Sequence, residues 1–144
     1  MVSLARKCRA ACDVIVAAFA VYRARRAVAK RPLGALVGRS PQAVPDSADN
    51  RLTELEQTTA ERWGVAVDRA LRWVPGDSAC LVRAGALSQI VQSRGIPNAV
   101  VRIGVRRGES GFEAHAWVEQ DGTPIAEPTS LRGAFSSLDG VTLT

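Results

Sequence analysis

The sequence predicts an α+β fold, in which helices come first and an antiparallel β-meander follows. Two observations carry this prediction. Apolar residues recur with a period of about 3.6 residues as far as residue 94, and after Pro97 the period changes to two. Helices followed by strands in this order are typical of the α+β class. The chain has 144 residues, of which 47% are apolar, so it is long enough for one domain with a buried core.

The first predicted helix covers about residues 4–29, a stretch of good helix formers without glycine or proline. Residues 1–31 carry eight Lys and Arg side chains against the single acid Asp13, whereas the rest of the chain is slightly acidic. Such a basic helix is compatible with nucleic acid, an anionic membrane or an acidic partner, but a solvated face is the favoured interpretation. Its predicted apolar stripe comprises Ala11, Ile15, Ala18, Phe19 and Tyr22.

Residues 31–49 are rich in proline and glycine and form a linker or an ordered loop. We therefore divide the chain into a basic helix with its linker, residues 1–49, and a core, residues 50–144. The second predicted helix begins at Asp49 or Asn50 as N-cap and ends before Pro75-Gly76. Its apolar residues, which follow a helical period, are Leu52, Leu55, Trp63, Val67, Ala70, Leu71 and Val74.

The third predicted helix begins at Asp77 or Ser78 as N-cap and ends at Gly95, with a left-handed glycine cap. Cys80 lies in its first turn, where unpaired backbone N–H groups and the helix dipole favour the nucleophilic thiolate. Free cysteine is also one of the most frequently buried residue types, so a core role is the competing interpretation. The helix is amphipathic, and we expect it to pack on the meander that follows.

The part of the chain after Pro97 alternates apolar and polar residues, which is typical of half-buried strands. In the strand that contains them, His115 and Trp117 share one face, and the small or apolar neighbours share the other. An Asp-Gly turn leads into a return strand that ends at Pro128. The predicted strands are 99–106, 112–119 and 123–127, with a short final pair at 135–138 and 141–143.

Cysteine catalysis needs a base within hydrogen-bond reach and a third group that orients the base. His115 is the only histidine of the chain, so it is the candidate base. With a two-residue loop at 121–122, Glu127 would lie on the opposite face from His115, whereas a three-residue loop at 120–122 would place the two directly across from each other. An Asp-Gly pair suits either loop. We predict the longer one, because only that register builds a triad of Cys80, His115 and Glu127.

The composition of the chain argues against a disulfide framework, a metal site and a membrane-spanning helix. Three cysteines exclude a complete disulfide framework, and one histidine argues against a zinc site, so neither a metal nor a cofactor is expected. The apolar run at residues 14–21 is far shorter than the ~20 residues that a membrane-spanning helix needs. The default prediction is a reducing, cytoplasmic setting.

Two blocks of sequence surround the candidate nucleophile and base. They are Cys80-Leu-Val-Arg-Ala, continuing to Arg94-Gly-Ile-Pro97, and Ala114-His-Ala-Trp-Val-Glu119 with the Asp-Gly turn behind it. Together they resemble the transglutaminase-like cysteine peptidase of lasso-peptide biosynthesis, over roughly residues 50–128. The resemblance implies a transglutaminase-like or papain-like core with Cys80 and His115 in catalysis. The third triad member of that family is an aspartate on the strand after the turn, and Glu127 stands at the matching position.

The resemblance also implies partners. That family removes the leader from a ribosomally made precursor before a separate ATP-dependent cyclase closes the macrolactam ring. Some members carry a leader-binding domain in front of the protease, whereas residues 1–49 here lack strand patterning. We therefore expect a stand-alone peptidase whose partners are the leader of the precursor, a separate leader-binding protein and the cyclase. Nucleic acid is not expected, and a membrane contact of the basic helix is not favoured.

Two other functions stay open. A transglutaminase-type acyl transferase would use the same triad with an amine in place of water. A non-catalytic scaffold would hold a precursor or partner protein and would not need the Cys80 thiol. The leader peptidase is favoured because the resemblance is specific to it.

Overall fold

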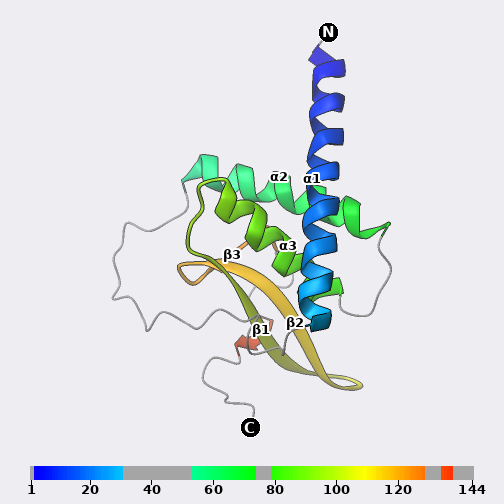
Figure 1. The fold of residues 1–144 in the computed structure, drawn as a ribbon. Coiled ribbons are helices and arrows are strands. Elements are labelled where there is room, and N and C mark those ends of the chain that lie inside the picture. The colour runs from blue at the N-terminus through cyan, green and yellow to red at the C-terminus, as the bar shows by residue number, and fades with distance from the viewer. Residues whose placement is uncertain (1, 31–52, 74–78, 129–133, 138–144) are drawn as a thin grey trace.

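The computed structural model describes residues 2–30, 53–73, 79–128 and 134–137, and it has the predicted order of helices before strands (Figure 1). The α+β prediction is therefore confirmed. The helices are α1 (Val2–Lys30), α2 (Glu54–Leu71) and α3 (Ala79–Ser93). The strands are β1 (Ala99–Gly108), β2 (Gly111–Gln120), β3 (Thr123–Ile125) and β4 (Ser136–Ser137).

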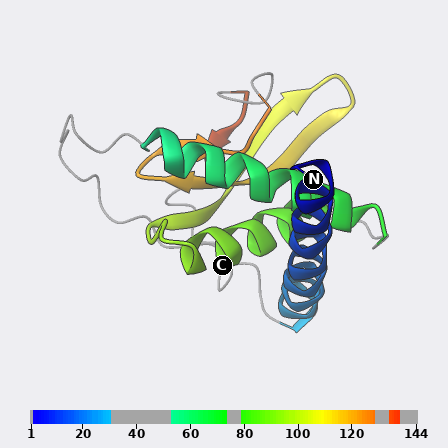
Figure 2. The same ribbon diagram turned by 90° about the horizontal axis from the view of Figure 1, so that it is seen from above.

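The described strands form one antiparallel sheet in the order β3-β2-β1-β4. The helices cover one face of this sheet, and α1 runs past α2 and α3 so that its N-terminal end projects beyond them (Figures 1 and 2). The Ser88 hydroxyl of α3 donates a hydrogen bond to the Ala99 carbonyl oxygen at 2.8 Å, which fixes α3 on the start of β1. The predicted final strand pair is represented by β4, and residues 138–144 lie outside the described residues.

The core lies between the helices and the sheet. Its largest fully buried side chains include Trp63 of α2, Leu87 of α3 and Val118 of β2, so two helices and the sheet contribute to one cluster. α1 belongs to the same cluster through Ala17, Val21 and Ala24. Burying this apolar surface is the main stabilising contribution to such a domain. The division of the chain at residue 49 stays a prediction.

α1 faces the core with a different side from the apolar stripe of the sequence prediction. Its buried side consists of small residues with Asp13 at one end, and Arg62 Nε of α2 donates to an Asp13 oxygen at 2.7 Å. Small side chains let α1 approach α2 and α3 closely, and the ion pair satisfies the one buried carboxylate on that side. The larger apolar side chains Ile15, Phe19 and Tyr22 are therefore left exposed.

Local chemistry explains the helix ends that the structure describes. α2 begins after Thr53, whose side chain and Glu56 form a reciprocal capping box, so the prediction of Asp49 or Asn50 as the cap is wrong. α3 ends in a Schellman motif, in which the Ile96 N–H donates to Val91 and the Gly95 N–H to Gln92. Gly95 has φ +95°, so the predicted left-handed glycine cap is confirmed. The predicted caps Asp77 and Ser78 lie outside the described residues.

Candidate active site

The turn between β2 and β3 is a two-residue loop, and the predicted three-residue loop is wrong. Glu119 pairs with Pro124, and Gln120 pairs with Thr123. Asp121 has φ 49° and Gly122 has φ 81°, and positive φ at both loop positions is the conformation of the tight hairpin turn that matches strand twist. Aspartate and glycine tolerate that conformation better than most residues, so the local chemistry decides for the shorter loop.

Glu127 nevertheless reaches His115, because the chain leaves the strand before Glu127. β3 ends at Ile125, and Ala126 has φ 51°, which is a left-handed conformation uncommon for alanine. This residue breaks the alternation of the strand, so the Glu127 side chain does not follow the face that the two-residue register would give it. Oε2 of Glu127 lies 3.1 Å from Nε2 of His115. The predicted contact is therefore confirmed, although the register that led to it is wrong.

Arg83 of α3 fixes the Glu127 carboxylate from its other side. Its Nη1 donates to Oε1 of Glu127 at 2.6 Å, and its Nη2 donates to the Ala126 carbonyl oxygen at 2.9 Å. Its Nε donates to Oδ1 of Asp68 on α2 at 2.6 Å. The Glu127 side chain is only 4% exposed, so this guanidinium compensates a carboxylate that has lost its water. The chain of contacts Asp68, Arg83, Glu127 and His115 joins two helices to the sheet.

The charge of Arg83 is secured by the same contacts. Burial works to lower the pKa of Arg83, but the hydrogen bond and charge of Asp68 and the charge of Glu127 outweigh it, so the net shift is upward. The guanidinium is therefore a fixed positive charge between two acids. One Glu127 oxygen is occupied by Arg83, and the other is left for His115.

Arg83 and Asp68 were not among the predicted site residues. The sequence offers one signal for Arg83, because it stands three positions after Cys80 and side chains at that spacing share a helix face. Asp68 carries no such signal, since it lies on another helix and meets Arg83 only through the packing of α2 on α3.

The imidazole of His115 lies between aromatic rings. Trp117 stacks beside it with ring centroids 6.1 Å apart, and the Phe135 ring lies at 5.2 Å. Gly104, which pairs with His115 across the hairpin, leaves room for the Trp117 indole, because an added Cβ would come within 2.6 Å of it. The indole N–H donates to Glu119 at 2.8 Å. These contacts limit the rotation of the imidazole, whose Nδ1 is the ring nitrogen that does not face Glu127.

Cys80 is the second residue of α3, and its thiol is partly buried at the edge of the core. α3 packs on β2 through Ala116 and Val118, whereas His115 points to the other face of the sheet. Within the described residues no hydrogen bond joins Cys80 to His115. The structure thus brings His115 and Glu127 together and places Cys80 on the neighbouring helix, in the same first turns that carry Arg83.

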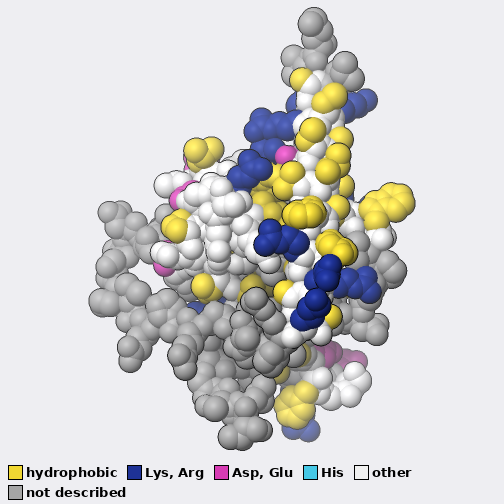
Figure 3. All heavy atoms as spheres, viewed as in Figure 1, with side chains coloured by type: hydrophobic (Ala, Val, Ile, Leu, Met, Phe, Trp, Pro, Cys, Tyr) yellow, Lys and Arg dark blue, Asp and Glu magenta, His cyan; other side chains and the backbone are white. Residues whose placement is uncertain are grey.

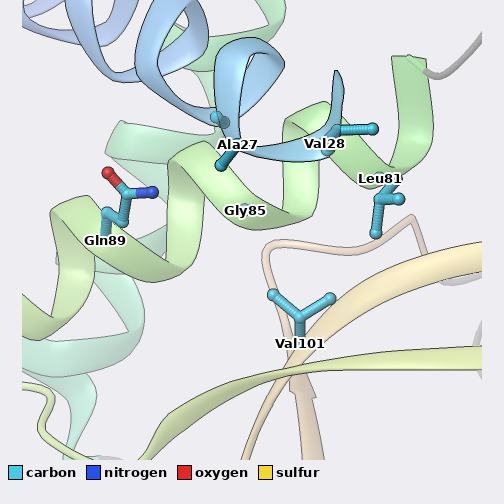
Figure 4. A pocket seen from close by; sticks show the side chains of 7 residues that line it. Ala27, Val28, Leu81, Gly85, Gln89 and Val101 are labelled. Carbon is cyan, nitrogen blue, oxygen red and sulfur yellow. The ribbon is translucent and has the colours of Figure 1, made fainter. Parts of the chain in front are cut away.

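A small cavity among the described residues does not form a second site. A cavity of about 30 Å³ lies between α1, α3 and β1, lined by Ala24, Ala27, Val28, Leu81, Gly85, Gln89 and Val101 (Figure 4). It has no titratable side chain and is too small for a peptide side chain, so it is a packing gap. No cluster of three metal-ligating side chains occurs among the residues described, and no described helix is both long and apolar enough to cross a bilayer.

Comparison with known proteins gives the family. The family model described as the transglutaminase-like superfamily matches residues 14–139, which is most of the chain and includes all the residues of the site. Searches among curated proteins and among solved structures found no match. The fold, with a cysteine-bearing helix packed on an antiparallel sheet that carries the histidine, agrees with this assignment. The chain belongs to the transglutaminase-like superfamily.

Proposed function

We propose that this chain is a cysteine endopeptidase that removes the leader from a lasso peptide precursor. The observation that carries the proposal is the buried Glu127 carboxylate, which Arg83 holds in place 3.1 Å from His115. A histidine oriented in this way is the base that a cysteine nucleophile requires. The superfamily includes cysteine peptidases and acyl transferases, and the sequence blocks around Cys80 and His115 resemble the lasso leader peptidase.

In the proposed reaction the Cys80 thiolate attacks the carbonyl carbon at the junction of leader and core. The Cys80 backbone N–H donates to the oxygen on which negative charge develops. Protonated His115 gives its Nδ1 proton to the leaving amine, the C–N bond breaks and a thioester remains on Cys80. His115 then takes a proton from water, and the resulting hydroxide attacks the thioester. The C–S bond breaks, the leader leaves as a carboxylic acid that ionises in solution, and the Cys80 thiolate and protonated His115 are restored.

Glu127 acts throughout as the orienting acid. Its Oε2 accepts from Nε2 of His115, which keeps Nδ1 directed to the reacting atoms and stabilises the imidazolium. The proposal also requires a rearrangement that brings Cys80 and His115 within hydrogen-bond reach when the precursor binds, because no hydrogen bond joins them in the described residues and His115 points away from α3.

The test is reconstitution of the chain with its precursor peptide, with and without a separate leader-binding protein, followed by mass measurement of the products. We expect free leader and free core, slow cleavage by the chain alone, and faster cleavage with the leader-binding protein. A product in which an amine is joined to the leader carbonyl would favour acyl transfer instead. An intact precursor under all these conditions would support the scaffold.

Replacing Glu127 with glutamine is expected to lower the cleavage rate by roughly 10²- to 10⁴-fold, because an amide cannot stabilise the imidazolium as a carboxylate does. Glu127→Asp should be milder if the site relaxes by one methylene. The matched control is Glu113→Gln, which changes a half-exposed carboxylate on β2 that pairs with Arg106. An unaffected rate in Glu127→Gln would leave a Cys-His dyad as the better description.

Gly64 of α2 is expected to control the placement of Glu127, because an added Cβ would lie 2.8 Å from the Ala126 Cβ. Alanine should favour the helix by about 1 kcal/mol, but the clash displaces Ala126 and with it the carboxylate. We expect Gly64→Ala to slow cleavage by roughly ten- to a hundred-fold. The double variant with Ala126→Gly should recover part of the rate.

The control for that series is Gly85→Ala on α3, where the added Cβ makes an ordinary 3.5 Å contact with Ala24. Equal rates for Gly64→Ala and Gly85→Ala would show that the position of Ala126 does not matter to the reaction.

A further inference from the structure

The outer face of α1 carries an apolar stripe that the core does not use. We call it the α1 seam and define it as Cys12, Ile15, Phe19, Tyr22 and Arg26. Its three large side chains are 69%, 63% and 54% exposed in sequence order, and the described residues leave them in solvent. Figure 3 shows hydrophobic side chains following this helix with Lys and Arg side chains beside them. Contiguous exposed apolar surface of this kind marks an interaction site.

The seam has the spacing of a coiled coil. Its members follow one another at intervals of three, four, three and four residues, which is the heptad pattern of positions a and d. Exposed Val16 and Ala18 widen the apolar surface in the N-terminal half, but in the C-terminal half Arg23 and Arg25 flank the seam on both sides. There the seam is only as wide as one partner helix, whereas an apolar face that meets lipid is broader. Arg26 also stands within the seam itself, where lipid would have to accept its charge and a partner helix needs only one acid opposite.

The rings of the seam are held in place before any partner binds. The Arg23 guanidinium lies 5.9 Å from the centre of the Phe19 ring, and the Arg26 guanidinium lies 5.7 Å from that of Tyr22. Arg26 Nη1 also donates to the Tyr22 hydroxyl at 3.1 Å. Side chains fixed in this way lose less conformational entropy on binding.

The flanking charges indicate what kind of helix binds. The heptad positions beside the seam, which set partner choice in coiled coils, hold Arg23 and Arg25, with Val16 and Ala18 one heptad before. A second copy of this chain has no acid at these positions, and a parallel pair would set Arg26 against Arg26, where like charges oppose pairing. Complementary charge therefore requires acids on the other helix.

We propose that the α1 seam binds an amphipathic helix of another protein, which has apolar residues at its a and d positions and Asp or Glu beside them. This interaction is independent of the peptidase chemistry, since none of the seam residues belongs to the candidate active site. It gives a surface through which a partner can be held beside the enzyme.

The probe is a synthetic helical peptide of several heptads with leucine at a and d and glutamate at the flanking positions. Binding to the full chain is measured by calorimetry. We expect binding that weakens as salt rises, and no binding of a matched peptide with lysine in place of glutamate. Equal binding of the two peptides, or of neither, would overturn the proposal. So would binding only to phosphatidylglycerol vesicles, or self-association through the seam in sedimentation.

Two sets of variants locate the interaction. Phe19→Ser with Tyr22→Ser should weaken binding of the acidic peptide by about ten-fold or more, whereas Phe112→Ser, which changes an even more exposed ring on β2, should not. Arg23→Glu with Arg25→Glu should abolish binding of the acidic peptide and create binding of the lysine peptide. Circular dichroism checks that each variant is folded. Loss of binding in Phe112→Ser, or unchanged preference in the charge variant, would refute the assigned surface.

Discussion

Replacing Cys80 with alanine is expected to lower leader cleavage by roughly 10⁴-fold or more, because the thiolate forms the bond on which every later step depends. His115→Ala should cost about as much, and the double variant should be no slower than either single one, since members of a triad act as a unit. Rates are measured by mass spectrometry of the precursor under single-turnover conditions. Circular dichroism should show an intact fold, because neither side chain supports much of the core.

The matched control is Cys8→Ala, which removes an exposed thiol from α1 and should leave the rate unchanged. It separates the chemistry of Cys80 from a general effect of thiol loss. A Cys80→Ala chain that still cleaves at near-normal rate would remove this residue from the mechanism and favour the scaffold function.

The sequence predicted the elements of the fold better than their orientation. The change of period after Pro97 marks the passage from helices to strands correctly, because periodicity follows directly from burial. The burial of α1 was harder to predict, since its two faces are both apolar. Close packing selected the alanine face, and the seam with Ile15 and Phe19 was left outside. Periodicity alone cannot rank two such faces.

The candidate site shows the same limit. The contact between His115 and Glu127 was predicted, but the route to it was not, because alanine gives no local signal for the positive φ that Ala126 adopts. Strain of this kind is held by the surroundings, here by the packing of Gly64 and the hydrogen bond from Arg83. Contacts between residues far apart in the sequence therefore decide the backbone conformation of Ala126.

Replacing Arg83 with methionine is expected to destabilise the fold by about 3 kcal/mol, because it leaves the buried Glu127 carboxylate without its charged partner. The free energy of unfolding is measured by urea denaturation. Arg83→Lys should cost less, since the charge remains but one ammonium group cannot reach Glu127, Asp68 and the Ala126 carbonyl together. The double variant with Glu127→Leu should recover stability while remaining inactive, because it removes the unpaired charge and the orienting acid at once.

The matched control is Arg106→Met, which breaks an ion pair of the same kind between Arg106 and Glu113 on the exposed part of the hairpin. Both partners of that pair are well solvated, so its loss should cost less than about 1 kcal/mol. If Arg83→Met cost no more than Arg106→Met, water would reach Glu127, and Arg83 would not be what holds the carboxylate against His115. A large cost that the Glu127→Leu change relieves would instead identify Arg83 as the residue that positions the acid, because a merely structural arginine would not depend on Glu127.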